Sequence, residues 1–98
     1  MKFNLKNKTL LITGGLGDFG KVIVKKFIEL GCNVIITTTN KSKEKNSKKI
    51  KIFYLDFKNE NSINDFEKKI RNIKKIDYLI NNAGINILDS IYNIKKKN

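Results

Sequence analysis

Residues 9–20 read TLLITGGLGDFG, and this stretch decides the fold of the 98-residue chain. Its first five residues are apolar or β-branched and run into glycines, which is typical of a buried strand. Residues 19–30 then carry apolar side chains at the 3.6-residue spacing of an amphipathic helix. Gly31 stands where a glycine commonly ends a helix. The stretch therefore predicts a strand, a glycine turn and a helix in direct succession.

The connection between this strand and this helix contains three regularly spaced glycines, Gly14, Gly17 and Gly20. Gly14 permits a tight turn at positive φ, Gly17 lets a pyrophosphate approach the backbone, and Gly20 lacks the Cβ that would keep the helix off the strand. The helix N-terminus adds free N–H groups and a positive dipole end that suit phosphate. The pattern predicts a dinucleotide-binding loop, with an ordinary glycine-rich turn as the alternative.

The next segments continue the alternation of strand and connection. Residues 33–38 predict a second strand, and residues 50–55 predict a third that closes with Asp56. Residues 40–49 between them contain no hydrophobic residue and predict a solvated loop or a poor helix. This connection is barely long enough for a crossover between parallel strands.

A second helix and a fourth strand complete the pattern. Ser62 and Asp65, three residues apart, predict an N-terminal cap, and an apolar stripe of helical period runs over residues 63–73. Residues 76–80 predict the fourth strand, and residues 85–98 again show helix-like apolar spacing. Strands alternating with helices indicate an α/β fold with a parallel sheet.

The composition excludes several kinds of site. The chain has no His and only Cys32, so it cannot itself form a His-dependent triad, a Cys/His zinc site or a disulfide framework. It shows neither a signal-peptide apolar region nor an apolar run of about 20 residues. We therefore expect a cytoplasmic protein without a membrane partner, in which Cys32 is a packing residue.

The net charge is +12, from 21 Lys and Arg against 9 Asp and Glu. Such a surplus suggests nucleic acid or an anionic membrane surface as a partner. However, Arg71 is the only arginine, and arginine is the usual source of bidentate contacts to bases and phosphates. The lysines are also spread along the chain, as a compositional bias of the genome would produce. We expect no specific nucleic-acid partner and keep a basic nucleic-acid-binding protein as an alternative.

Three motifs together resemble the short-chain dehydrogenase/reductase family. They are TGGLGDFG at residues 13–20, Asp56 after the third strand, and NNAG at residues 81–84 after the fourth. The resemblance covers essentially the whole chain. It implies an incomplete NAD(P)-binding Rossmann domain over residues 1–98. It also implies that the intact enzyme transfers a hydride between NADP(H) and a carbonyl or alcohol.

The implied fold is a partial doubly wound parallel sheet of about four strands in the order 3-2-1-4. The fourth strand is then an open edge, where further strands should pair. We therefore expect the isolated chain to be marginally stable, prone to aggregation, or dependent on a complementary C-terminal piece or a second copy.

The resemblance also implies a set of residues around the adenosine and pyrophosphate of the cofactor: Gly14, Leu16, Gly17, Asp18, Phe19, Gly20, Thr38, Asp56, Phe57, Asn82, Ala83 and Gly84. Within this set, Thr38 holds the position that discriminates the ribose 2′ group. Asp56 accepts a hydrogen bond from the adenine amino group, and Asn82 lies along the ribose and ties strands together. The simpler alternatives are that Asp56 only terminates a strand and that Asn82 only bonds the end of the sheet.

Two features bear on the cofactor. Residues 36–40 contain no carboxylate to hold a ribose 2′-OH. NADP is therefore expected over NAD, with Thr38, Thr39 and Lys41 as donors to a 2′-phosphate, unless the threonines are merely strand formers. Asp18 also stands where compact members of the family have a glycine, and a carboxylate beside a pyrophosphate is electrostatically unfavourable.

The catalytic Ser and Tyr-x-x-x-Lys of the family are expected beyond residue 98. The same spacing occurs at Tyr54–Lys58, which begins in a strand, and at Tyr92–Lys96, which is too close to residues 81–84. We expect neither pair to be catalytic, so the chain alone should have no activity. A non-catalytic dinucleotide-binding or interaction module is the second hypothesis.

Overall fold

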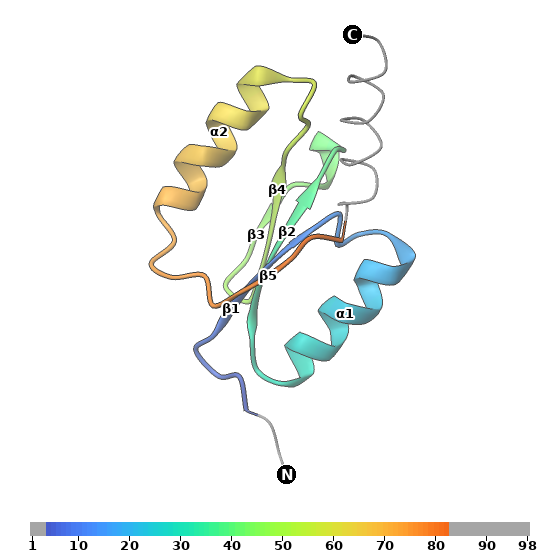
Figure 1. Cartoon of the computed structure of the whole chain (residues 1–98), viewed down its shortest axis with the longest axis vertical. Coiled ribbons are helices and arrows are strands. Elements are labelled where there is room, and N and C mark those ends of the chain that lie inside the picture. Colours follow the sequence, from blue (N-terminus) through green and yellow to red (C-terminus); the bar gives the residue numbers. More distant parts are fainter. Residues whose placement is uncertain (1–3, 83–98) are drawn as a thin grey trace, which may run out of the picture.

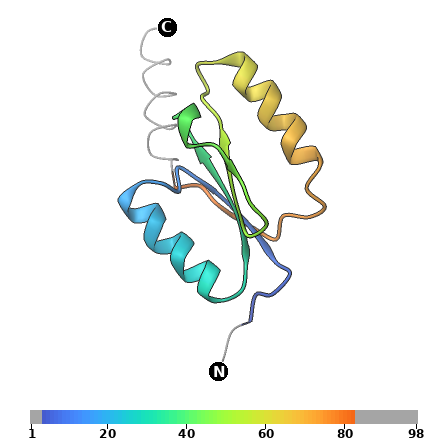
Figure 2. The ribbon, with the colours of Figure 1, turned by 180° about the vertical axis from the view of Figure 1, so that it is seen from behind.

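The computed structural model describes residues 4–82, which form a five-stranded sheet with one helix on each face (Figure 1). Turning the molecule by 180° shows the same layering from behind (Figure 2). The elements in chain order are β1 (Thr9–Thr13), α1 (Asp18–Glu29), β2 (Asn33–Thr38), the 3₁₀ helix η1 (Lys41–Lys43), β3 (Lys45–Asn46), β4 (Ile50–Tyr54), α2 (Glu60–Arg71) and β5 (Tyr78–Ile80).

The sheet has the order β3-β4-β2-β1-β5. The pairs β1–β2, β1–β5 and β2–β4 are parallel, so the predicted α/β class and the 3-2-1-4 order of the four expected strands are confirmed. The fourth strand, Tyr78–Ile80, is two residues shorter than the predicted residues 76–80, and Asp77 is hydrogen-bonded to Thr9 directly before it. The third strand ends at Tyr54, one residue early.

Residues 40–49 contain a short strand that the sequence prediction missed. The solvated loop or poor helix predicted there is instead η1 followed by β3, which pairs antiparallel with β4. The connection is too short to carry a helix across a face of the sheet, so the chain returns in the plane of the sheet along the outer edge of β4. Backbone hydrogen bonds to β4 stabilise this path, although both residues of β3 are exposed.

The main core lies between the sheet and α1. Leu10, Ile12 and Cys32 have no exposed surface, and Val34 and Ile36 are almost fully buried. Residues in register point to the same side, so Leu10 lies beside Val34 and Ile12 beside Ile36 under the helix. Burial of these side chains contributes most of the stability of this layer.

The predicted end of α1 is confirmed. Gly31 has a φ of 92° and donates its N–H to the Ile28 carbonyl, while the Cys32 N–H reaches the Phe27 carbonyl. This pair of bonds is a Schellman motif, which requires a residue of positive φ. The Cys32 thiol lies 3.3 Å from the Lys8 carbonyl, and burial raises its pKa, consistent with a packing residue.

The predicted cap of the second helix is wrong. The Asn59 side chain caps α2 by accepting the Ser62 N–H at 3.1 Å. Ser62 is buried inside the first turn, where its hydroxyl accepts the Asp56 N–H at 2.9 Å and lies 2.8 Å from the Asp56 carbonyl. Asp65 is exposed. Because the Ser62 hydroxyl is engaged with the Asp56 backbone in the loop after β4, the cap is supplied by Asn59.

Asp77 joins the starts of β1 and β5. Its N–H donates to the Thr9 carbonyl at 2.9 Å, and its Oδ2 accepts the Thr9 N–H at 2.8 Å. Lys75 and Lys8 lie 3.4 and 3.9 Å from Oδ1, and the carboxylate side chain is 10% exposed. The Thr9 hydrogen bond, followed by the lysines, lowers the pKa of Asp77 from its ordinary value of 3.8.

We expect Asp77→Asn to destabilise the chain near neutral pH and to flatten its acid dependence. A carboxyl whose pKa is lowered by folding stabilises the folded state above its unfolded pKa, and this stabilisation is lost as the pH falls through the folded value. In denaturant unfolding between pH 7 and pH 3, the free energy of unfolding of the wild-type chain should fall toward that of the variant as the pH decreases. Asp65→Asn, at an exposed carboxylate, is the control. A constant difference at all pH values would contradict this account.

β5 is an edge strand of the described sheet and contains Leu79, which is 67% exposed. We expect the chain to self-associate through this edge and Leu79→Lys to shift it toward monomer, because a charge on an edge strand disfavours pairing. Val22→Lys, at a side chain that is 71% exposed on α1, is the matched control. Sedimentation equilibrium measures the effect. A wild-type chain that is monomeric and unfolds cooperatively above about 60 °C would contradict the prediction.

Candidate nucleotide-binding site

The sequence motifs converge at one end of the sheet. The glycine turn follows β1, Thr38 ends β2, Asp56 follows β4, and Asn81 and Asn82 follow β5. All four strands are parallel, so their carboxyl ends share one edge (Figure 1). Ligands of open parallel sheets bind at this edge. The fold therefore brings the described candidate residues into one region.

Gly14 is the centre of this region. It has a φ of 64°, a conformation that glycine adopts without a steric cost. Its N–H donates to the Thr37 hydroxyl at 3.2 Å, and its carbonyl accepts the Gly17 N–H at 3.3 Å and the Asn82 side-chain N–H at 2.9 Å. The turn is thereby bonded to β2 on one side and to the end of β5 on the other.

The other glycines of the turn meet different surroundings. A Cβ on Gly20 would lie 2.7 Å from the Gly15 Cα and 2.9 Å from the Gly14 carbonyl oxygen, both backbone atoms. A Cβ on Gly15 would lie 2.9 Å from the Ile36 side chain, a constraint that sequence reasoning missed. A Cβ on Gly17 would contact only the Gly14 oxygen, at 3.7 Å. Packing thus excludes a side chain at Gly20 and disfavours one at Gly15, but it does not exclude one at Gly17.

Helix α1 begins at this turn without a side-chain cap. Gly17 is the N-cap, and the first helical bond runs from the Lys21 N–H to the Gly17 carbonyl. The N–H groups before Lys21 have no intrahelical acceptor, and they point out at the start of the helix. Asp18 and Phe19 are exposed there, Phe19 by 77%. Leu16, expected to line the loop, is partly buried against the core.

The end of β2 carries a chain of short polar contacts. The Thr38 hydroxyl accepts the Asn40 N–H at 3.1 Å, and the Asn40 side-chain oxygen accepts the Ser42 N–H at 3.1 Å and its hydroxyl at 2.7 Å. Thr38 is 9% exposed. These contacts fix the backbone that leads to Lys41. The sequence did not predict the contact between the Thr37 hydroxyl and the Gly14 N–H, because a threonine within a strand indicates only a preference for β structure.

Asp56 and Phe57 lie on the loop after β4. The Asp56 Oδ1 accepts the Lys58 N–H at 3.0 Å and so shapes this loop. A carboxylate has two oxygens, so this contact leaves acceptor capacity for a ligand. Phe57 is 61% exposed beside it. Tyr54, of the rejected Tyr54–Lys58 spacing, ends β4, and its hydroxyl lies 3.4 Å from the Asn59 side-chain nitrogen.

The residues after β5 fasten this strand to the glycine turn. The Thr13 hydroxyl donates to the Asn81 side-chain oxygen at 2.9 Å, and Asn82 donates to Gly14 as described above. The predicted tie between strands by Asn82 thus has a geometric counterpart. Ala83 and Gly84, and the Tyr92–Lys96 spacing, lie outside the described residues.

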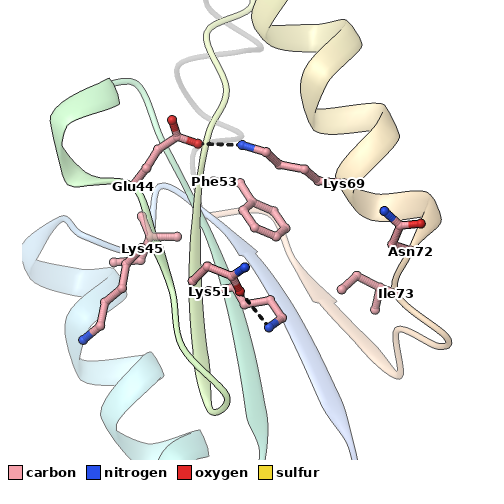
Figure 3. Close-up of a pocket in the computed structure, with 9 residues that line it drawn as sticks. Glu44, Lys45, Lys51, Phe53, Lys69, Asn72 and Ile73 are labelled. Atoms are coloured by element: carbon pink, nitrogen blue, oxygen red, sulfur yellow. Dashed lines mark hydrogen bonds and ion pairs between the residues drawn. The ribbon is translucent and has the colours of Figure 1, made fainter.

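Two cavities lie between the β3–β4 edge and α2, away from the glycine turn. The larger has a volume of about 550 Å³ and is drawn in Figure 3. Three lysines, Lys45, Lys51 and Lys69, line it together with Phe53. The smaller, of about 180 Å³, includes Lys41. Both contain Glu44, whose pKa is lowered chiefly by its hydrogen bond from Lys69.

Two classes of site are missing from the part of the chain that the structure describes. Residues 4–82 bring together no group of three His, Cys, Asp or Glu side chains that could hold a metal ion. Neither α1 nor α2 is long and apolar enough to cross a membrane.

The sequence model of the short-chain dehydrogenase family matches residues 8–98. The chain is 38% identical over 104 aligned residues to the 3-oxoacyl-[acyl-carrier-protein] reductase FabG of Buchnera aphidicola, covering 94% of this chain and 40% of that protein. It is 36% identical over 90 residues to the uncharacterized oxidoreductase YxbG of Bacillus subtilis, covering 83% and 33%. The chain thus spans 40% or less of the length of these two curated relatives.

A solved structure superposes on most of this chain. A short-chain dehydrogenase from Leptospira borgpetersenii, crystallised with bound NAD+, superposes with a TM-score of 0.63 at 28% identity. The match covers 82% of this chain and 32% of that one. With the family model matching nearly the whole sequence and the strand order that the family implies, the chain belongs to the short-chain dehydrogenase family.

Proposed function

We propose that residues 4–82 hold the adenosine and pyrophosphate of a nicotinamide dinucleotide in an oxidoreductase. The cofactor would supply hydride transfer between NADP(H) and a carbonyl or alcohol. The chain spans 40% or less of its two curated relatives, so the substrate and the catalytic groups belong to the remainder of such a protein. The NAD+ complex of the Leptospira relative supports the cofactor class.

The surroundings of Gly17 carry this proposal. A Cβ there would make one ordinary van der Waals contact, with the Gly14 carbonyl oxygen at 3.7 Å, and the φ of −70° at Gly17 is accessible to any residue. Packing therefore does not require a glycine, and the helix favours one only through the modest N-cap preference over Ala or Val, whereas a pyrophosphate lying against the backbone needs the missing side chain. The uncapped N-terminus of α1 beside it offers N–H donors and the positive end of the helix dipole. The residues present fit a dinucleotide.

The 2′ end of the site favours NADP. No carboxylate lies on residues 36–40 to accept a ribose 2′-OH, and a carboxylate there would repel a 2′-phosphate. The turn that starts with Thr38 leads directly to Lys41, which offers a positive charge. Thr38 and Thr39 add hydroxyl donors. NADP preference is thus proposed from the polar groups at the end of β2.

The adenine would lie between the ends of β2 and β4. Asp56 has a free acceptor site for the adenine amino group, and Phe57 is an exposed ring beside it. Asn82 would pass along the ribose while its amide holds Gly14. Ala83 and Gly84 are carried over from the family pattern.

We expect the 98-residue chain to bind NADPH more tightly than NADH, and Thr39→Asp to reduce or reverse this preference by repelling the 2′-phosphate. Thr39 is exposed, so the substitution should leave the fold intact. Isothermal titration calorimetry measures both affinities, with Asn64→Asp on α2 as the control. Equal affinities for the two cofactors in the wild-type chain would contradict the NADP preference, and turnover of a carbonyl substrate would contradict the placement of catalysis elsewhere.

Substitution at Gly20 should lower stability, whereas substitution at Gly17 should abolish cofactor binding. Gly20→Ala should lower the free energy of unfolding by about 1–3 kcal/mol, because its Cβ would overlap backbone atoms. Gly17→Val should change stability by no more than about 1 kcal/mol, since only the N-cap preference is affected, yet abolish NADPH binding. Chemical denaturation and calorimetry separate the two readouts. NADPH binding by Gly17→Val at wild-type affinity would overturn the proposed pyrophosphate loop.

A further inference from the structure

A salt bridge ties the connection after β2 to helix α2. The Lys69 Nζ lies 2.7 Å from the Glu44 Oε2 (Figure 3), and the two residues are 25 apart in the chain. The same oxygen accepts the Tyr54 N–H at 3.4 Å. The Glu44 and Lys69 side chains are 29% and 42% exposed, so this ion pair is only partly screened by solvent.

Lys69 is held in place by a second contact. Its ammonium lies 5.3 Å from the centroid of the Phe53 ring, which is 6% exposed. A cation over an aromatic face is favourable at this distance. Lys69 therefore has two fixed partners, a carboxylate and a ring, and its stem runs along the wall of the larger cavity (Figure 3).

Glu44 has a second cation within its electrostatic reach. Glu44 and Lys41 line the same cavity of about 180 Å³, and the Glu44 N–H donates to the Lys41 carbonyl at 3.2 Å. The pKa of Glu44 is lowered mainly by Lys69, with a smaller contribution from Lys41. Without Lys69, the carboxylate would have Lys41 as its remaining neighbouring cation among these residues.

We propose that Lys69 is a specificity-determining residue that acts through Glu44. By neutralising Glu44, it leaves the charge of Lys41 available to a ribose 2′-phosphate and removes a repulsive carboxylate from that end of the site. Lys69 itself is a positioning residue, because it acts on the ligand through another side chain. The inference rests on the proposed NADP-binding function and extends it to α2, an element outside the family motifs found in the sequence.

The test compares two ligands that differ only in the 2′-phosphate, adenosine 2′,5′-bisphosphate and 5′-AMP. Lys69→Met keeps the stem on Phe53 and removes the charge. At low ionic strength it should weaken binding of the bisphosphate by about two- to fivefold, the range of a partly exposed charge pair, and leave 5′-AMP unchanged. Lys68→Met is the matched control, since it removes the same charge from an exposed neighbouring position and should have a smaller effect.

A double variant distinguishes electrostatics from loss of structure. Glu44→Gln combined with Lys69→Met should restore most of the bisphosphate affinity, because no carboxylate is left to compete for Lys41. A double variant as weak as Lys69→Met, or equal losses for both ligands, would overturn the proposal while leaving the proposed function intact. Failure of the wild-type chain to bind either ligand would overturn both.

Discussion

The backbone of Gly14 is the point on which the rest of the structure depends. Its N–H is bonded to β2 through Thr37, its carbonyl to the end of β5 through Asn82, and the start of α1 packs so closely on it that Gly20 has no room for a Cβ. This geometry requires the positive φ that glycine supplies. One turn therefore joins the ends of three strands and places the N-terminus of α1 at the carboxyl edge of the sheet.

The periodicity of the sequence was sufficient to predict the parallel core, because buried strands and an amphipathic helix leave a clear apolar pattern. It was insufficient for β3, whose Lys45 and Asn46 are exposed and pair through the backbone alone. The candidate site likewise contains some contacts that the sequence predicts and others that it does not. The roles of Gly14 and Gly20 follow from local chain geometry, whereas the contacts of Thr37 and Gly15 depend on which face of β2 meets the turn, and that is settled only by tertiary packing.

The connection after β2 shows where individual charges of this lysine-rich chain are placed. This connection brings Glu44 within 2.7 Å of Lys69 on α2, and the Lys69 ammonium in turn lies over the Phe53 ring of β4. The only acidic residue on η1 and β3 or between them is thereby paired on the side away from the glycine turn. Net charge alone suggests a nonspecific polyanion partner, whereas the placement of individual charges favours a defined phosphate at the end of β2.

In the proposed function, the turn between β1 and α1 receives the pyrophosphate of a dinucleotide. Amide chemical shifts of the isotopically labelled 98-residue chain, followed by NMR during titration with NADPH, test it most directly. Binding of the pyrophosphate at this turn should give saturable shift changes that are largest for residues 14–20 and extend to residues 38–42. Changes confined to the lysines of β3 and β4, or changes that disappear in moderate salt while residues 14–20 stay unmoved, would contradict it.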